Sequence, residues 1–469
     1  MAIYVFSLLV GYVPNGVDNA QGMRDKYLSR ISADVIYVYE DMPTDRYVKR
    51  YCNLGIHHDK MISLHLLPTG HAKIGGPEIT EVPHHVGNKL VAQEYVSDRL
   101  LFTDYYTHNQ GQEDAGALLC KRSFKRLDGS TAYDSMFDEK GQRIYLFPDG
   151  EICNQYEFYE KCIEALNLSK DDIILLDRPN QLPYMQALFS KSHGAKIIPF
   201  LHSGHYYEKN EDPDCIYMNK EYYFYFKHAN YIDTFLVSTQ EQRDDLIRCL
   251  EEYGCRQTDV VCLPICGIDS LRCQKNRIPF SLLTVARHDP RKKLDIAIRS
   301  VILAHERIPE LFLDLYGRGD EEYTDYLKEI VVQNGADSYI HFKGYCDVKE
   351  VYKNYEAYLS TSLWETFGLT LLEATASGNA MVGFNVRYGN RLFIKNNENG
   401  YLVNLEYERM DEACYVDMLV ESLADRIVKL FSDSEKLSKM QEKSYEIASE
   451  FWEYKISKQW CKFMEEKMK

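Results

Sequence analysis

The chain has 469 residues, of which 45% are hydrophobic, and 55 basic against 71 acidic side chains give it a formal net charge of −16. This length favours two or three domains over one, and the hydrophobic content is ample for large cores. An acidic surface without a basic run does not attract nucleic acid, which we exclude as a partner. Any anion must therefore be bound by a local cationic cluster.

The thirteen cysteines do not form a disulfide pattern. Several, including Cys120, Cys262 and Cys266, lie inside apolar runs, and no CxxC pair occurs, so we expect buried thiols and no zinc site. The apolar start at residues 2–10 predicts a strand, and no window approaches the ~20 apolar residues of a spanning helix. These features favour the cytoplasm, and they leave peripheral contact with the inner face of a membrane open.

Strands and helices alternate at the start of the chain. A strand at 2–10 is followed by a glycine loop at 11–17, a helix at 18–29 and a strand at 34–40. Gly16 would let a ligand approach the N-terminus of this helix closely. A glycine loop of this kind is weak as a motif by itself, because most such turns only reverse the chain.

Between residues 42 and 155 the strand–helix alternation gives way to a series of short segments in which apolar and polar residues alternate. Alternating segments such as 89–96, 116–124 and 143–147 are separated by turn signals that contain Asp-Gly or Lys-Gly. The pattern predicts an antiparallel β-meander inserted into an α/β domain. It is either a stabilising addition or a docking surface for a large acceptor or a protein partner, and its many aromatics favour docking.

The strand–helix alternation then resumes and continues through a second unit. Strands are predicted at 173–177, 196–201, 235–239, 260–263, 281–286, 311–316, 340–342 and 358–363. Helices are predicted at 157–166, 184–192, 222–229, 294–304, 321–333, 348–355 and 370–377, with a further helix ending near 249. Such alternation indicates parallel sheets covered by helices, with ligands at the carboxyl ends of the strands.

The predicted fold class is therefore α/β, with two Rossmann-like domains that face a shared cleft. The first domain comprises 1–41 and 156–270, with 42–155 as the inserted meander. The second comprises 271–435, and helices at 436–469 are expected to pack back on the first domain.

The segment Glu365–Ala374 combines a strand end, a tight loop with Gly368 and the start of an apolar helix. Unpaired backbone N–H groups at such a helix start can bind a phosphate, and the helix dipole adds partial positive charge. Carboxylates would repel a phosphate but accept hydrogen bonds from vicinal hydroxyls. Glu365 and Glu373 beside a phosphate site therefore predict a nucleotide sugar as ligand.

Cationic residues follow the first strand of the second unit. Arg287 ends that strand, and Lys292 precedes the next helix, so both can converge on a diphosphate. The neighbouring Lys293 is ambiguous and is expected in solvent. In the first domain, His202 ends a strand and faces the cleft, where a ligand role and a structural role are about equally favoured. His205 follows one short turn later, and its part in the site is left open.

Together these residues resemble the retaining glycosyltransferases of family 4, which have the GT-B fold. The diphosphate pair of that family matches Arg287 and Lys292, its Glu-x7-Glu signature matches Glu365 and Glu373, and its glycine loop and mid-domain histidine match Gly16 and His202. The resemblance implies that Glu373 binds the ribose, Glu365 the donor sugar and His202 the region of its 6-hydroxyl. It implies that Gly344 and Tyr345 hold the uracil and that the amides of Phe367, Gly368, Leu369 and Thr370 bind the diphosphate.

A closer resemblance is to the catalytic subunits of accessory-Sec peptide O-GlcNAc transferases. It rests on the segment 15–21, on Arg24 and on the inserted meander. It implies a UDP-sugar donor, UDP-GlcNAc or UDP-glucose, a serine-rich adhesin as acceptor, and a homologous non-catalytic partner subunit. Teichoic-acid α-glycosyltransferases share the insertion and remain an alternative, as does a peptide O-glucosyltransferase.

The expected chemistry is the departure of UDP, which fixed cations and amides assist. No cofactor and no metal are expected, since no carboxylate cluster suits a divalent ion. The family resemblance implies front-face attack, with the leaving phosphate oxygen taking the acceptor proton. The non-enzymatic alternative is a degenerate GT-B subunit that only binds glycosylated peptide. A P-loop or GxGxxG fingerprint, which kinase-like or dehydrogenase sites need, does not occur in the chain.

Overall fold

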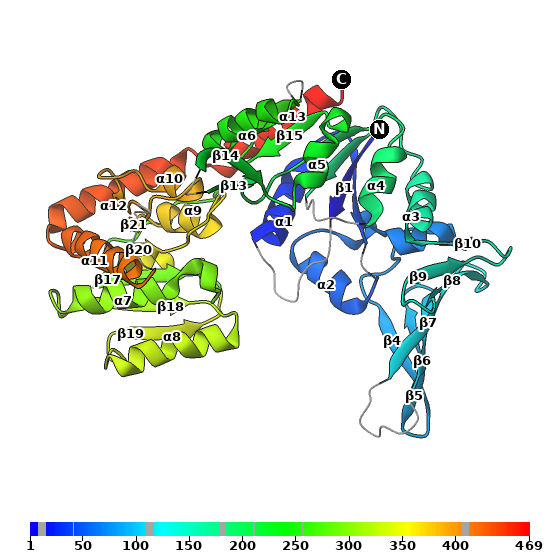
Figure 1. Ribbon diagram of the computed structural model, residues 1–469, viewed down its shortest axis with the longest axis horizontal. Helices are drawn as coiled ribbons and strands as arrows, with labels where there is room; N and C mark the ends of the chain where they lie inside the picture. Colours follow the sequence, from blue (N-terminus) through cyan, green and yellow to red (C-terminus); the bar gives the residue numbers. More distant parts are fainter. Residues whose placement is uncertain are drawn as a thin grey trace.

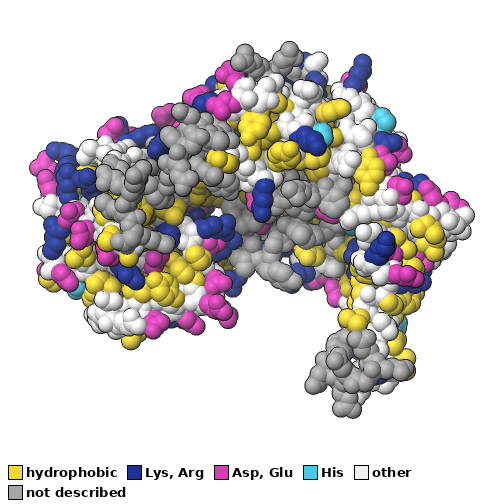
Figure 2. All heavy atoms as spheres, in the orientation of Figure 1, with side chains coloured by type: hydrophobic (Ala, Val, Ile, Leu, Met, Phe, Trp, Pro, Cys, Tyr) yellow, Lys and Arg dark blue, Asp and Glu magenta, His cyan; other side chains and the backbone are white. Residues whose placement is uncertain are grey.

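The computed structural model describes residues 1–7, 16–40, 42–108, 117–177, 183–209, 212–255, 258–405 and 412–469. Two α/β domains lie side by side, and a long antiparallel sheet projects from the first (Figure 1). The predicted α/β architecture with two Rossmann-like domains and an inserted meander is confirmed. The space-filling view is hollowed between the two domains (Figure 2). Among the described helices, none is long and apolar enough to cross a membrane.

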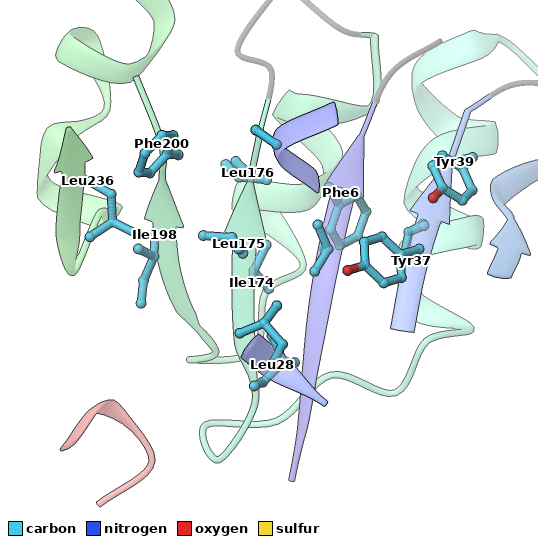
Figure 3. Close-up of a cluster of buried hydrophobic side chains, with 14 of the residues drawn as sticks. Phe6, Leu28, Tyr37, Tyr39, Ile174, Leu175, Leu176, Ile198, Phe200 and Leu236 are labelled. Atoms are coloured by element: carbon cyan, nitrogen blue, oxygen red, sulfur yellow. The ribbon is translucent and has the colours of Figure 1, made fainter. Parts of the chain in front are cut away.

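The N-terminal domain is built on a parallel sheet with the strand order β12-β11-β1-β2-β3. Its strands are β1 (Ala2–Ser7), β2 (Asp34–Tyr39), β3 (Met61–Ser63), β11 (Ile173–Leu176) and β12 (Lys196–Pro199). A further parallel pair, β15 (Thr234–Val237) and β16 (Asp259–Cys262), continues this layer through a bridge from Phe200 to Leu236. Side chains of neighbouring strands, among them Phe6, Leu175 and Ile198, form the core (Figure 3).

Helices cover both faces of this sheet, as buried apolar strands require. They are α1 (Gly16–Leu28), α2 (Asp45–Asn53), α3 (Gln155–Glu164), α4 (Pro183–Ser190), α5 (Tyr223–Lys227) and α6 (Gln240–Glu252). A short hairpin, β13 (Tyr206–Lys209) and β14 (Asp212–Met218), was not predicted from the sequence. It lies directly after His202, on the side of the domain that faces the second domain (Figure 1).

The projecting sheet has seven strands in the order β10-β9-β8-β7-β6-β5-β4. They are β4 (Thr80–Val86), β5 (Lys89–Val96), β6 (Leu100–Thr107), β7 (Leu118–Lys125), β8 (Thr131–Phe137), β9 (Arg143–Leu146) and β10 (Ile152–Cys153). Aromatic packing fixes its base, where the rings of Tyr145 and Phe158 stack with centroids 3.7 Å apart.

The start of the predicted insertion differs from the structure. Residues 42–79 do not belong to the antiparallel sheet, because they form α2 and also β3, which pairs in parallel with β2. Tyr51 of α2 lies against Tyr39 of β2, with ring centroids 3.9 Å apart. The antiparallel sheet therefore begins at Thr80 instead of near residue 42.

The C-terminal domain has a six-stranded parallel sheet in the order β19-β18-β17-β20-β21-β22. Its strands are β17 (Ile278–Val285), β18 (Phe312–Tyr316), β19 (Ile340–Gly344), β20 (Tyr355–Ser360), β21 (Ala380–Phe384) and β22 (Gly400–Val403). Its helices are α7 (Leu294–His305), α8 (Glu321–Gln333), α9 (Leu369–Ala376), α10 (Gly389–Phe393), α11 (Glu412–Phe431) and α12 (Ser434–Ser449).

The helix predicted at 348–355 is wrong. Only the 3₁₀ turn Tyr352–Asn354 forms there. The side-chain amide of Asn379 donates to the carbonyls of Tyr352 and Tyr355 at 3.0 and 2.7 Å. These hydrogen bonds hold the end of the segment, and Tyr355 pairs in parallel with Ile278 of β17, so the chain passes straight into β20.

The last helix, α13 (Glu453–Lys467), crosses from the second domain back to the first (Figure 1). Its Trp460 is fully buried against the N-terminal domain and donates its indole N–H to the carbonyl of Pro264 at 2.9 Å. The preceding α12 stays on the C-terminal domain, where Ser444 donates to the carbonyl of Asn379 at 2.6 Å. Of the predicted segment 436–469, it is thus the second helix that contacts the first domain.

Candidate functional site

Loops at the carboxyl ends of β17, β18 and β19 meet at one edge of the C-terminal sheet. The amide of Gly317 donates to the carbonyl of Gly344 at 2.8 Å, and that of Ala286 donates to Tyr316 at 3.0 Å. Gly317 has φ of +141°, and a Cβ there would lie 1.9 Å from the carbonyl oxygen of Ala286, so only glycine allows this approach. The loops are thereby held in contact beside the predicted uracil segment.

Gly344 and Tyr345 lie in this loop cluster. Gly344 has φ of +72°, which favours glycine, and Tyr345 is 59% exposed. The guanidinium of Arg318 lies 4.7 Å from the centroid of the Tyr345 ring. An exposed aromatic ring that a cation holds at the carboxyl end of a strand can stack against a planar ligand.

Arg287 and Lys292 flank the turn that joins β17 to α7. The Arg287 side chain is 60% exposed, and its Nε lies 3.9 Å from Asp289 Oδ2. Hydrogen bonds from Arg291, opposed in part by burial, lower the pKa of Asp289 to about 2. Lys293 has φ of +47° and directly precedes α7. Arg287 therefore extends from a turn that Asp289 and Arg291 hold together.

Lys292 and Glu365 form an ion pair, with the Lys292 Nζ 2.5 Å from Glu365 Oε1. Their side chains are 23% and 16% exposed. This contact was not predicted, since the sequence assigned the two groups to different parts of a ligand. It places both at the same point and makes the pair neutral as a unit, and Arg287 adds a largely exposed cation to this edge.

The first turn of α9 lies next to this pair. Gly368 has φ of +85° and ends the loop, and Phe367 is buried against Phe393 and Phe451. A Cβ on Gly16 would lie 3.5 Å from Leu369 Cδ1, so α1 and α9 begin opposite one another across the domain boundary. The loop at 11–15, predicted before Gly16, lies outside the described residues.

Further along α9, Glu373 lies in a largely buried position. Burial raises the pKa of its carboxyl group, and the hydroxyl of Tyr352 donates to Oε2 at 2.9 Å. The Arg272 guanidinium acts in the opposite direction on the same carboxyl group. One α-helical turn spans 3.6 residues, so Glu373 follows Leu369 by about one turn. Glu365 and Glu373 thus lie before and within the helix, as the Glu-x7-Glu spacing predicts.

His202 is placed by a buried network that sequence reasoning missed. Its Nε2 lies 3.2 Å from Asp177 Oδ1, and the side chain is 7% exposed. Asp177 also accepts hydrogen bonds from Arg24 and, at 2.6 Å, from Gln21. Burial opposes ionisation of Asp177, but Arg24, His202 and Gln21 outweigh it and lower its pKa to about 2. An ionised Asp177 holds the His202 ring in one orientation.

Arg24 itself is fully buried between aromatic rings. Its guanidinium lies 5.8 Å from the ring centroid of Phe200 and 5.4 Å from that of Trp460. The sequence did offer a signal, since Gln21 and Arg24 are three residues apart and share one face of α1. His205 is also buried, and burial lowers its pKa to about 3, so it is neutral.

Two family models match parts of the chain. Residues 274–447 match the glycosyl transferases group 1 model, and residues 72–149 match the GtfA extended β-sheet domain. The GtfA subunit of the UDP-N-acetylglucosamine–peptide N-acetylglucosaminyltransferase of Streptococcus gordonii is 30% identical over 509 residues, covering 99% of both chains.

Solved structures match over the same length. The crystal structure of the pneumococcal O-GlcNAc transferase GtfA with UDP and GlcNAc has a TM-score of 0.85 and 29% identity, covering 100% of this chain and 99% of the other. The GtfA/B complex matches with a TM-score of 0.85 and 27% identity, covering 100% of each chain.

The two facing Rossmann-like domains, with the cationic edge and helix start between them, define a glycosyltransferase of the GT-B class. The projecting sheet places the chain further within that class, because most of it lies inside the matched extended β-sheet domain. The chain belongs to the GtfA family, to which it is similar from end to end.

Proposed function

We propose that this chain transfers GlcNAc from UDP-GlcNAc, with retention, to Ser or Thr hydroxyls of a serine-rich protein. The observation that carries the proposal is the convergence of Arg287, the Lys292–Glu365 pair and the start of α9 at one edge of the C-terminal sheet. The family relation supports it, since the relatives similar to the whole chain are peptide N-acetylglucosaminyltransferase subunits.

The donor would lie across this edge. Arg287 would bind the diphosphate in a bidentate fashion, and the amides of residues 367–370 would bind it from the helix start. Lys292 would contact the second phosphate while its partner Glu365 accepts hydrogen bonds from the sugar hydroxyls. Glu373 would bind the ribose, and Gly344 with Tyr345 would hold the uracil. His202, from the other domain, would contact the sugar near its 6-hydroxyl.

Catalysis would consist of stabilising the negative charge that develops on departing UDP. Fixed cations and backbone amides are worth most where water is excluded, because they need no reorganisation during the reaction. The acceptor hydroxyl would attack from the face that UDP leaves, and the leaving phosphate oxygen would take its proton. Turnover should then persist in excess EDTA. Trapping a covalent sugar adduct on an enzyme carboxylate would contradict this route.

Acceptor and partner would bind the projecting sheet. Its edge strand β4 is exposed along its whole length, and apolar side chains such as Val86 and Phe137 are 69% and 47% exposed. The structure of a GtfA/B complex supports a homologous partner subunit for this chain as well. The described cysteines are all free thiols, which supports a reducing cytoplasm as the site of action.

The test is a UDP-release assay with the purified chain, UDP-GlcNAc and a serine-rich peptide, with the peptide mass measured in parallel. We expect UDP release to rise with peptide and the peptide to gain GlcNAc residues. UDP-glucose as donor and a polyol phosphate as acceptor test the alternatives in the same assay. Arg287→Ala should abolish most turnover, and Arg307→Ala, an exposed arginine at the end of α7 that pairs with Asp425, serves as the matched control. Binding of glycosylated peptide without any UDP release would contradict the enzymatic proposal.

A further inference from the structure

A buried cluster joins the two domains beside the donor loop. Its centre is Tyr206, which is fully buried at the start of β13. Arg387 of the C-terminal domain donates to the phenolic oxygen of Tyr206, and its guanidinium lies 4.5 Å from the ring centroid. Arg248 of α6 donates to the same oxygen at 2.8 Å. Cations of both domains thus hold one tyrosine of the N-terminal domain.

Arg387 also faces a carboxylate of the N-terminal domain. Its Nη1 lies 3.6 Å from Asp245 Oδ2, with the two side chains 19% and 20% exposed. A planar guanidinium can stack on a ring and donate in its plane at the same time, which a lysine cannot. The geometry at Tyr206 and Asp245 uses both properties. Arg387 therefore fixes the position of α6 and β13 relative to its own segment.

The residues directly after Arg387 hold the backbone of Glu365. The amides of Tyr388 and Gly389 donate to the carbonyl of Glu365 at 2.7 and 2.6 Å. A Cβ on Gly389 would lie 2.3 Å from the carbonyl oxygen of Phe367, so this segment packs directly on the donor loop. The cross-domain contact at Tyr206 and the backbone that carries Glu365 are therefore one residue apart.

A second contact crosses the boundary at the same loop. Trp364, which precedes Glu365, lies on the backbone of Gly204, two residues after His202. A Cβ on Gly204 would lie 1.8 Å from Cζ2 of the Trp364 indole. This distance leaves room for glycine alone. The loop that carries Glu365 is thus joined to the N-terminal domain on two sides, through Trp364 and through Arg387.

We propose that Arg387 is a positioning residue that sets the distance between His202 and Glu365, which belong to different domains. The inference rests on the proposed function, in which these two side chains contact the donor sugar. Arg387 acts through Tyr206 on the N-terminal side and through Tyr388 and Gly389 on the other. The nucleotide contacts, by contrast, lie within the C-terminal domain. Loss of Arg387 should impair sugar transfer and spare binding of the nucleotide.

The test compares Arg387→Met with Arg391→Met in the full chain. Arg391 lies on the same segment and also crosses the boundary, with Nη1 2.5 Å from Glu241, but this pair is exposed and should matter little. A displacement of about 1 Å costs up to about 100-fold in turnover. We expect Arg387→Met to lower kcat for UDP-GlcNAc by about 10- to 100-fold and to change the Kd for UDP less than about twofold. Arg391→Met should leave both within about twofold.

Two further variants keep the inference testable if Arg387→Met unfolds. Arg387→Lys retains the charge near Asp245 and should recover part of kcat. Gly204→Ala displaces Trp364 and should give the same loss of kcat with normal UDP binding. Normal kcat in both Arg387→Met and Gly204→Ala, or equal losses in kcat and UDP affinity, would overturn the inference. A wild-type chain that binds UDP but does not turn over UDP-GlcNAc would overturn the proposed function, and this inference with it.

Discussion

Substitution of Asp177 tests the network that orients His202. Asp177 is fully buried and accepts hydrogen bonds from Arg24 and Gln21. Asp177→Asn keeps the shape of the side chain but leaves the buried Arg24 guanidinium without its counter-charge. Breaking a buried ion pair from one side costs about 3–5 kcal/mol. The retained amide oxygen can still accept hydrogen bonds, so we expect a loss near the lower end of this range.

The pKa of Asp177 gives an independent magnitude. A fall from the ordinary 3.8 to about 2 corresponds to about 2.4 kcal/mol at about 1.36 kcal/mol per pKa unit. Because the folded pKa is depressed, this stability is fully present above pH 3.8 and is lost as the pH falls through about 2. The difference between wild type and Asp177→Asn should therefore be constant from pH 7 to 5 and shrink between pH 4 and 2.

Urea unfolding followed by tryptophan fluorescence is a suitable assay. The chain has three tryptophans, and Trp460 lies 5.4 Å from the Arg24 guanidinium, so it reports on this region. Asp171→Asn, an exposed neighbour before the same strand, is the matched control and should change stability by less than about 0.5 kcal/mol. If Asp177→Asn unfolds at the same urea concentration as this control at pH 7, the reasoning is refuted.

Three further substitutions or deletions test the donor and acceptor assignments. Arg287→Ala removes a charged hydrogen-bond donor worth about 1.5–3 kcal/mol. It should lower kcat/KM for UDP-GlcNAc, measured by UDP release, by about 10- to 100-fold. An unchanged kcat/KM would show that Arg287 does not bind the diphosphate. Glu373→Gln should raise the Kd for UDP in calorimetry by about tenfold while inorganic pyrophosphate binds as before, and equal weakening of both would contradict a ribose contact. Deletion of residues 80–96, the outer hairpin of the projecting sheet, should leave the Kd for UDP unchanged and reduce peptide modification by at least about tenfold, whereas normal modification would place the acceptor elsewhere.

Local signals explain what could be predicted from the sequence. The strand, loop and helix around Glu365 and Glu373 are encoded within about twenty residues, and the structure forms α9 within one residue of the predicted start. The position of Arg287 and the start of α7 could be predicted in the same way. An apolar strand precedes the turn that contains Arg287, and an apolar helix follows it. The sequence also predicted the helix after Gly16, although α1 begins at Gly16 itself and not at residue 18.

Contacts between distant residues could not be predicted in the same way. Asp177 lies 153 residues from Arg24 and 25 from His202, and Lys292 lies 73 from Glu365. Lys292 and Glu365 each had a predicted role alone and Asp177 had none, and only the fold shows which groups are partners. The helix expected at 348–355 failed for the same reason, because Tyr355 at its end pairs with Ile278 of the distant strand β17. Propensity carries no information about such a competitor.

The two sheets of the N-terminal domain differ in when they can form during synthesis. In the projecting sheet each strand pairs with its neighbour in the chain, so pairing can proceed as residues 80–153 leave the ribosome. The parallel sheet must wait, since β1 pairs with β11 at residues 173–176. Trp460 is synthesised later still, after all the described strands of the C-terminal domain. Until then Arg24 lacks one of the two rings that enclose it, so the nascent chain carries a finished projecting sheet on an unfinished domain.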